Sequence, residues 1–229
     1  MQAKNRGFMK KYIVIMLSFT ALLLLVFSSF GLAPIRALAL NVRGASLNQL
    51  LFFDDFSHGS RRWSPQLGMW KVCSGSIDKT EYCAKASVEN FSMADKFTFS
   101  NYSVQADALY TQPISLNSIL AVLGRVKDSS HYYEFELTCD EFGMEWNIVL
   151  HNGSSVVYIA SGGYNWMANI RYTLRLDMNG SILTASLSTD GGKTYKLLGS
   201  GTDTTYTSGK IGLRTFGTGK FDNVTASSN

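Results

Sequence analysis

Beyond residue 50 the sequence alternates between apolar and polar residues, and this period of two constrains the fold more than any other feature. In NYSVQADALY, Val104 and Ala106 share one face of an extended strand, whereas Gln105 points to the other. About a dozen such segments follow one another between Gly, Asn, Asp and Ser turns, and none shows helical periodicity. The sequence therefore predicts an all-β chain.

Two further segments refine this prediction. Residues 118–126, SILAVLGRV, are apolar on both faces, which favours a central strand covered on both sides. Asn179-Gly180 lies between two alternating segments and predicts a tight hairpin turn. Strands without intervening helices favour two packed antiparallel sheets over a parallel α/β sheet. A chain of 229 residues that is 45% hydrophobic is long enough to bury one such core.

Residues 1–39 have the pattern of a signal peptide. Lys10 and Lys11 precede a long uncharged stretch containing ALLLLVF, and the small residues Ala37 and Ala39 follow it. An uncleaved membrane anchor is the alternative, because about 20 apolar residues also span a bilayer. In either case we expect the rest of the chain to lie outside the cytoplasm. It would be secreted, or would contact the membrane only through this segment.

The positive charge of the sequence belongs to this leader. The whole chain has a net charge of +4, and residues 1–39 carry five Lys and Arg residues and no acid, so the remainder has a net charge of −1. A near-neutral domain without a basic patch argues against nucleic acid as a partner. We expect a linker over 40–49 and one folded domain over 50–226.

Three cysteines lie in the predicted domain. Cys73 and Cys83 flank the turn-like sequence SGSIDKTEY and could face each other across a hairpin. Outside the cytoplasm they could form a disulfide, and two buried thiols are the alternative. Cys139 is left over, and no histidine pattern accompanies the three residues as a zinc site would require.

Four segments together carry a family resemblance: FFDDFSHGSRRWSPQLGMWKVCSG, FSNYSVQADALY, LGRVKDSSHYYEFEL and GKIGLRTFGTGKFDNVTA. In this order and spacing they resemble the concanavalin A-like jelly rolls of lectins and glucanases, especially secreted laminin-G-like and sugar-hydrolase-related domains. The resemblance covers essentially all of 50–226. It implies an all-β, two-sheet antiparallel jelly-roll sandwich, preceded here by the N-terminal signal or anchor helix.

The resemblance also implies a structural calcium site. In that fold the first and last strands pair, which would bring Asp55 and Asp222 together, with a backbone carbonyl from Gly59. Calcium takes six to eight oxygen ligands of this kind. Asp54 is then the outward partner of Asp55, or becomes the ligand if the strand register shifts by one residue. The alternative is that both neighbouring acids are edge charges that prevent strand-to-strand aggregation.

The catalytic motif of related sugar hydrolases is incomplete. Laminarinase-type relatives use the pattern Glu-x-Asp-x-x-Glu, and the nearest match is ELTCDE, in which Thr138 replaces the central aspartate between Glu136 and Glu141. We therefore expect the glutamates here to be solvated strand charges, and we expect His58, His131 and His151 to lie at the surface. A hydrolase is the less favoured interpretation.

The aromatic cluster GGYNWMAN offers a candidate binding site for sugars. Sugar rings stack on aromatic planes, and amide groups satisfy their hydroxyls, so Trp166, Tyr164 and Asn165 could bind a glycan together with Trp146. The alternative for the tryptophans is packing on the sandwich. The sequence thus favours a non-catalytic domain that binds a glycan or polysaccharide. A glycoside hydrolase and a structural or adhesive envelope protein are the rival functions.

Overall fold

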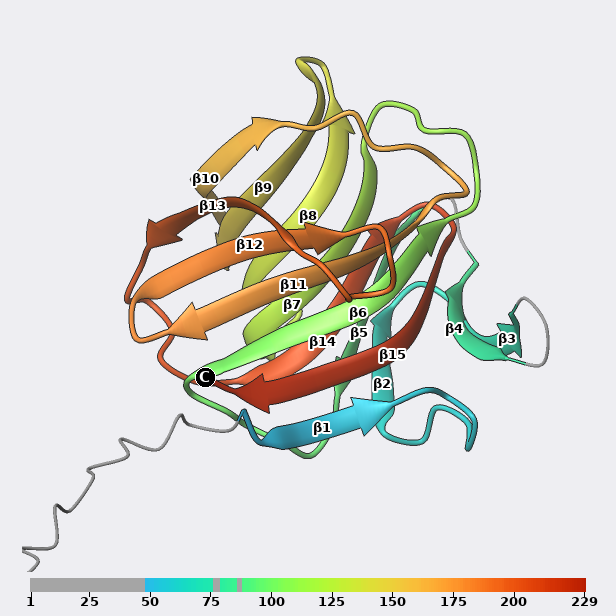
Figure 1. The fold of residues 1–229 in the computed structure, drawn as a ribbon, viewed down its shortest axis with the longest axis horizontal. Coiled ribbons are helices and arrows are strands. Elements are labelled where there is room, and N and C mark those ends of the chain that lie inside the picture. The colour runs from blue at the N-terminus through green and yellow to red at the C-terminus, as the bar shows by residue number, and fades with distance from the viewer. Residues whose placement is uncertain (1–47, 76–78, 86–87) are drawn as a thin grey trace, which may run out of the picture. The chain divides into compact units, whose positions relative to one another are not determined.

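A computed structural model describes residues 48–75, 79–85 and 88–229 (Figure 1). These residues form fifteen β-strands and no α-helix. A search of the same residues finds no helix of the length and hydrophobicity that membrane crossing requires. The predicted signal or anchor segment, 1–39, lies outside the described residues, as does most of the predicted linker. The all-β prediction is confirmed for the described chain.

Sheet A contains eight antiparallel strands (Figure 1). The eighth of them, β1 (Leu50–Asp54), pairs with β15 beside the main path of the sheet. The other seven follow the order β13 (Lys196–Thr202), β12 (Ile182–Ser188), β11 (Arg171–Asn179), β6 (Tyr102–Tyr110), β15 (Gly219–Ser228), β4 (Thr80–Ala84) and β3 (Trp70–Ser74).

Sheet B contains seven antiparallel strands. The segment SILAVLGRV forms most of β7, the fourth strand of the seven, and it is buried on both faces as predicted. The order is β10 (Ser155–Gly163), β9 (Gly143–Asn152), β8 (His131–Asp140), β7 (Ser118–Asp128), β14 (Lys210–Phe216), β5 (Glu89–Ala94) and β2 (Trp63–Leu67).

The two sheets pack face to face around one main core. Figure 1 shows β11, β12 and β15 running across the front while β8 and β9 run behind them. Val104 and Ala106 of β6 and Phe135 of β8 are fully buried in this core, on the faces that the alternation predicts. Each buried side chain of valine or phenylalanine size contributes about 1.5–3 kcal/mol to the free energy of unfolding. The predicted two-sheet sandwich is confirmed.

Trp146 fills the core where the edge strands of the two sheets meet. Its ring lies against Gly162 of β10 and Gly199 of β13. A Cβ atom built on Gly199 would come 2.6 Å from the ring, and one on Gly162 would come 2.7 Å from it. No larger residue fits at these two positions while the indole stays in place.

The last strand changes partner along its length. One side of β15 pairs with β6, while its other side pairs with β4 at Phe221 and with β1 from Val224 onward. The register against β6 shifts between Asp222 and Thr225, and Asn223 has a φ of 49°. The predicted pairing of the first and last strands is therefore present. It also creates an irregular point where β1 ends and β4 begins.

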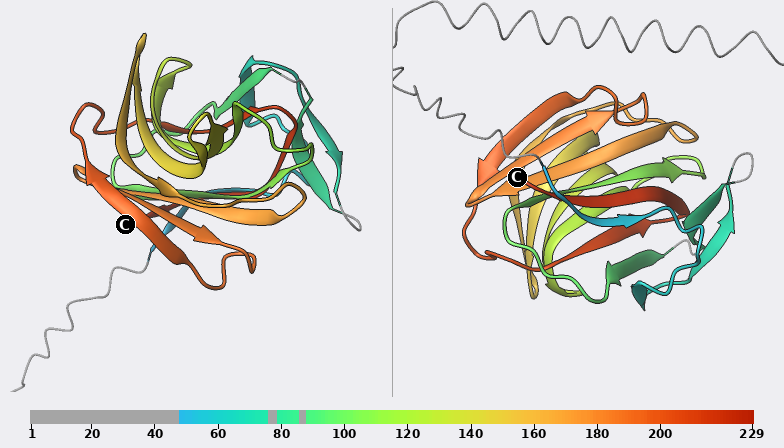
Figure 2. Two further views of the ribbon diagram at one scale, coloured as in Figure 1. Left: turned by 90° about the horizontal axis from the view of Figure 1, so that it is seen from above. Right: turned by 60° about the horizontal axis from the view of Figure 1, so that its bottom comes forward.

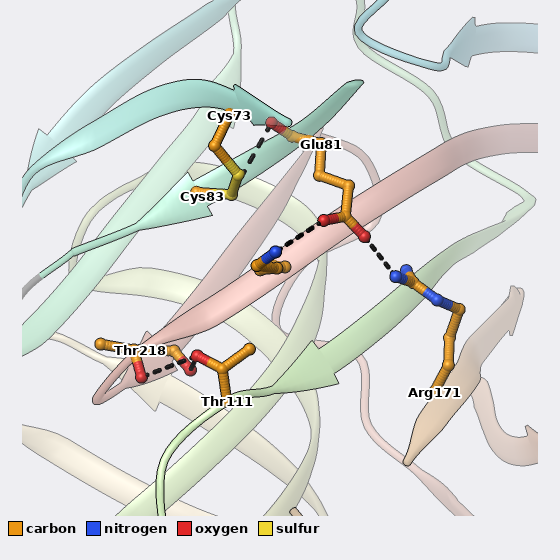
Figure 3. The surroundings of a disulfide bond; sticks show 7 residues. Cys73, Glu81, Cys83, Thr111, Arg171 and Thr218 are labelled. Atoms are coloured by element: carbon orange, nitrogen blue, oxygen red, sulfur yellow. Dashed lines mark hydrogen bonds and ion pairs between the residues drawn. A yellow bond between two sulfur atoms is a disulfide. The ribbon is translucent and has the colours of Figure 1, made fainter. Parts of the chain in front are cut away.

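The β3–β4 hairpin at one edge of sheet A carries a disulfide. Cys73 and Cys83 are bonded, with their Cα atoms 6.0 Å apart, and Cys139 is a free cysteine (Figure 3). Between them in sequence, the buried Glu81 pairs with Arg171 and Lys220. The disulfide, rather than the two thiols, is the state of this hairpin.

The hairpin predicted at Asn179-Gly180 is present between β11 and β12. Asn179 still pairs with Ile182, so the two turn residues are Gly180 and Ser181. Gly180 has a φ of 58°, which glycine adopts without steric cost. The turn therefore lies one residue later than the sequence indicated.

Candidate functional site

The strands of sheet B present a second face that is turned away from sheet A. Along β8, Phe135 points into the main core, whereas Glu134 and Glu136 lie on the opposite face. The sheet is strongly curved, and in Figure 2 (left) its olive and yellow strands β9 and β10 rise steeply along one side. We call this second face the concave face.

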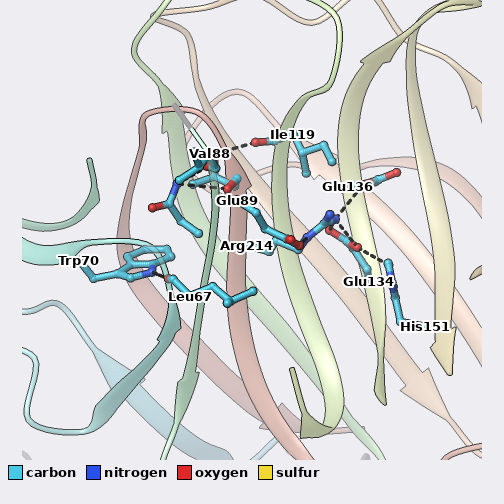
Figure 4. Close-up of polar contacts among 11 residues, drawn as sticks. Leu67, Trp70, Val88, Glu89, Ile119, Glu134, Glu136, His151 and Arg214 are labelled. Atoms are coloured by element: carbon cyan, nitrogen blue, oxygen red, sulfur yellow. Dashed lines mark hydrogen bonds and ion pairs between the residues drawn. The ribbon is translucent and has the colours of Figure 1, made fainter. Parts of the chain in front are cut away.

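Glu134 is the centre of a buried ionic network on the concave face (Figure 4). Arg214 of β14 donates from Nη1 to both of its carboxylate oxygens, at 2.8 and 2.9 Å. Nε2 of His151, on β9, lies 2.8 Å from Oε2. Arg214 also donates from Nε to Oε1 of Glu89 at 2.8 Å. Both oxygens of Glu134 are thus held by cationic or polar partners from two other strands.

Glu136 has a different environment two residues further along β8. Asn147, directly opposite it on β9, donates from Nδ2 to Oε1 at 3.1 Å. Nη1 of Arg214 lies 3.6 Å from its Oε2. Among the described residues, Oδ1 of Asn147 finds no hydrogen-bond partner although it is buried. A buried amide oxygen without a donor is energetically costly.

Glu134 and Glu136 differ in pKa because their surroundings differ. Burial would raise the pKa of Glu134, but the charge of Arg214 and the hydrogen bond with His151 outweigh it and hold this pKa below its usual value. For Glu136, burial and then repulsion from Glu134 raise the pKa to about 8. At neutral pH Glu134 is therefore an anion, while Glu136 carries a proton that it can donate.

A pocket of about 240 Å³ opens beside Glu136. Tyr158 of the edge strand β10 stands at its side with 61% of its surface exposed. The lining residues come from five strands and one loop: Asn117, Ile119, Glu136, Thr138, Asp140, Val149, His151, Val156, Tyr158 and Arg214. The pocket therefore combines an exposed aromatic ring with a protonated carboxyl group and other polar side chains.

The raised pKa of Glu136 has a consequence for stability. Between about pH 4.5 and 8 the folded protein binds a proton at this carboxyl that the unfolded chain has released. The free energy of unfolding should therefore fall as pH rises through this window, by at most about 1.4 kcal/mol per pH unit from this group. Glu136→Gln should remove that part of the slope, so the variant gains stability relative to wild type as pH rises.

Urea unfolding at pH 5, 6, 7 and 8 measures this slope. The exposed Glu141→Gln serves as the control and should follow the wild-type profile. Parallel profiles for wild type and Glu136→Gln would contradict the assigned protonation of Glu136.

These glutamates and His151 correct the expectation from the sequence. Glu134 and Glu136 are buried rather than solvated, and His151 is hydrogen-bonded to Glu134 rather than a free surface residue. Alternation alone places both glutamates on one face, but Arg214 reaches Glu134 from 80 residues away. No local pattern in the sequence predicts that contact.

The residues predicted to stack on sugars do not form one site. Trp166 is only 1% exposed, and its Nε1 donates to the carbonyl of Thr138 at 2.8 Å. Trp146 is buried in the core. Both tryptophans thus follow the packing alternative, because neither presents a ring face to solvent. Asn165 is exposed and Tyr164 is half-buried, with Nζ of Lys196 5.5 Å from the centre of its ring.

Asp55 and Asp222 line one pocket of about 280 Å³, at the point where β15 changes partner. Asp222 is buried, and burial raises its pKa. Asp55 lies just after β1 and accepts from the amide and hydroxyl of Ser57. Lys79 also lines this pocket, so a protein cation stands near the two acids. Gly59 lines a neighbouring pocket that Asp55 shares.

Asp54 does not point outward as the sequence indicated. It is 8% exposed, and its two oxygens accept from the amide of Phe56 and from Nε1 of Trp63. The two adjacent acids therefore lie in different environments, because successive side chains point to opposite faces of a strand. Asp54 satisfies a buried indole, and Asp55 faces the pocket at the partner change.

Comparison with solved structures gives the fold its name. The carbohydrate-binding module CBM66 from Bacillus subtilis is similar with a TM-score of 0.59 at 18% identity, covering 73% of this chain and 96% of the module. The exoplasmic/lumenal domain of VIP36 in its Ca²⁺-bound form gives 0.59 at 10% identity, covering 79% of this chain and 90% of that one. The chain has the concanavalin A-like jelly-roll fold.

A third similar structure is a Bacteroides ovatus GH16 protein solved with the product G4G4G3G, with a TM-score of 0.53 at 12% identity, covering 76% of this chain and 86% of that one. No protein-family model matches the sequence, and no curated protein matches it significantly. The family resemblance stated from the sequence is thus confirmed for the fold. The similarity to these solved structures shows the fold alone.

Proposed function

We propose that this chain binds carbohydrate, without cleaving it, on the concave face of sheet B. The observation that carries the proposal is the pocket beside Glu136, which brings this protonated carboxyl group next to the exposed ring of Tyr158. A sugar hydroxyl can accept from the carboxyl group, while the C–H face of a sugar ring packs on the tyrosine. The similar solved structures include a carbohydrate-binding module and the VIP36 domain in a Ca²⁺/Man2-bound form, which is consistent with this use of the fold.

The state of Glu134 favours binding over hydrolysis. Cleavage by two carboxylates needs both groups against the scissile bond, one as acid and one as nucleophile or base. Glu134 is fully buried, and both its oxygens are engaged by Arg214 and His151. It is therefore placed to orient Arg214 and to keep Glu136 protonated, not to contact a sugar.

A glycan array followed by calorimetry on the best ligand tests the proposal. Tyr158→Ala should weaken binding about tenfold, since loss of a stacking ring costs roughly 1 kcal/mol or more. Phe53→Ala, an exposed aromatic of β1 outside sheet B, should bind as wild type. Reducing sugar released from the bound polysaccharide would show cleavage instead. Equal loss in both variants, or retention in Tyr158→Ala, would place the ligand elsewhere, with the loop around Tyr164 and Asn165 as the next position to test.

The proposed setting is outside the cytoplasm. The Cys73–Cys83 disulfide requires an oxidising compartment to persist, and the leader-like segment 1–39 is the expected route there. Carbohydrate is abundant at cell surfaces, so the compartment and the ligand agree with each other.

A structural calcium ion at the Asp55–Asp222 pocket is a second part of the proposal. The donor chemistry fits, because two carboxylates and the side chain of Asn223 line one pocket next to an irregular backbone. A cation there would also offset the burial that raises the pKa of Asp222. Lys79 would have to turn away, so it would compete with the ion.

Calcium removal should therefore lower the melting temperature. We expect a decrease of several degrees on chelation, because a ligand that binds only the folded state stabilises it by mass action. Asp222→Ala should abolish the response to chelation, whereas Asp177→Ala, which lies on the same sheet and pairs with Arg175, should retain it. A wild-type melting curve indifferent to both chelator and added Ca²⁺ would exclude the site.

A further inference from the structure

Arg125 has an unusual backbone in the middle of a strand. It lies in β7 with a φ of 48°, where the register against β8 shifts between Gly124 and Asp128. A non-glycine residue in this left-handed region costs about 1–3 kcal/mol, and it persists only where the surroundings hold it. Here the amide of Arg125 donates to Oη of Tyr102 at 2.6 Å. The bulge turns the arginine side chain toward one end of the sandwich.

The guanidinium of Arg125 is buried but only partly satisfied. The residue is 1% exposed, Nε donates to the carbonyl of Ser100 at 3.1 Å, and Nη1 donates to that of Tyr206 at 2.8 Å. In the part of the chain that the structure describes, Nη2 donates to no protein atom. Two carbonyl dipoles hold the group in position without supplying an opposite charge.

Within residues 48–75, 79–85 and 88–229, no acid pairs with this cation. Arg171, Arg175 and Arg214 each form an ion pair with a carboxylate within 4.0 Å, but Arg125 forms none with any described residue. Asp203, from the same loop as Tyr206, is engaged by the hydroxyl of Tyr133 and the amide of Thr205. A buried charge without a counter-charge is strongly unfavourable, so an anion supplied from outside would stabilise it.

A pocket of about 310 Å³ gives an anion access to Arg125. Three separate connections meet there: the residues before β6, the β11–β12 turn and the loop between β13 and β14. None of the described residues that line it is acidic. Apart from Gly180, its other walls are small polar or hydroxyl-bearing residues: Ser100, Asn101, Ser181, Thr204, Tyr206 and Thr207.

We propose that this pocket binds a small oxyanion of the carboxylate or sulfate class, with Nη2 of Arg125 as the charged donor and the serine and threonine hydroxyls of the lining as neutral donors. Arginine matches the planar, paired oxygens of such groups better than any other side chain. The oxyanion can be a free ion or an acidic substituent of a glycan. Its pocket shares no residue with the concave-face pocket, so the two proposals stand or fall separately.

Thermal unfolding with added anions tests the proposal. Sodium sulfate and sodium glucuronate, compared with sodium chloride at equal ionic strength, should raise the melting temperature by about 2 °C or more at tens of millimolar. Glucose, which resembles glucuronate but lacks the carboxylate, should not. A response to glucuronate alone assigns the site to acidic sugars, and a response to both salts assigns it to oxyanions in general.

Two variants locate the effect. Arg125→Gln should abolish the response, and Thr207→Asp should abolish it without removing Arg125, because the new carboxylate occupies the pocket. The second variant decides the matter if Arg125→Gln fails to fold. Thr202→Asp adds the same charge to β13 outside the pocket and should respond as wild type. An equal response in Thr207→Asp, or none in wild type, would overturn the site.

Discussion

Replacing Arg214 with methionine should lower the free energy of unfolding by about 3–5 kcal/mol at pH 7. The change removes the group that donates to both oxygens of Glu134 and leaves that carboxylate fully buried with His151 as its remaining partner. Removing one partner of a buried ion pair lowers stability by far more than the intact pair contributes. The remaining charge stays buried without a partner, so its desolvation is no longer offset. Urea unfolding with linear extrapolation measures the difference.

Two controls separate this mechanism from general damage. Arg175→Met breaks the partly exposed pair with Asp177 and should cost no more than about 1 kcal/mol. The double variant Arg214→Met/Glu134→Gln should recover part of the loss, since the stranded charge is gone. The lowered pKa of Glu134 predicts that the deficit of Arg214→Met shrinks as pH falls below about 4.5, where wild type loses the contribution of this carboxylate. A deficit independent of pH and of Glu134 would contradict the assignment.

Replacing Trp166 with alanine should cost about 3–5 kcal/mol of stability. The indole is almost fully buried, packs edge-on against Tyr110 with ring centres 5.4 Å apart, and donates to the carbonyl of Thr138. Its removal leaves a cavity between the 164–168 loop and the sandwich and deletes the hydrogen bond to the Thr138 carbonyl on β8. The loss should appear as a lower urea midpoint in the absence of any glycan.

Neighbouring substitutions make the Trp166 result specific. Trp166→Phe should lose less, because it keeps most of the buried ring and gives up the indole hydrogen bond. Met167→Ala, at an exposed position next in sequence, should remain near wild type. A Trp166→Ala protein that unfolds like wild type but no longer binds glycan would instead restore the stacking role that the sequence suggested.

The strand faces could be read from the sequence because they depend on local alternation. Val104, Ala106 and Phe135 are buried where period two places them, and the doubly apolar β7 is central. Pairing of the first and last strands followed from the family resemblance, which encodes topology that local patterns lack. These features depend on hydrophobic side chains alone, and burial of such side chains is the main driving force of folding.

The site could not be read in the same way, because long-range polar contacts decide it. Trp166 stands in a glycine-led loop whose composition suggests exposure, yet the carbonyl of Thr138 and the ring of Tyr110 draw it inside. In the sequence Glu134 resembles an ordinary exposed strand residue. In the fold it contacts Arg214 and His151, which lie on other strands. The position of the Arg125 guanidinium likewise depends on a strand bulge, which no pattern in the sequence predicts.

The order of strands has a consequence for how such a chain is made. β14 lies between β7 and β5 in sheet B, and β15 lies between β6 and both β1 and β4 in sheet A, so residues 210–228 complete both layers from within. Neither sheet can close before this stretch has been synthesised, because β5 and β1 have no inner neighbour until then. The described domain therefore cannot complete either layer until residues 210–228 have left the ribosome.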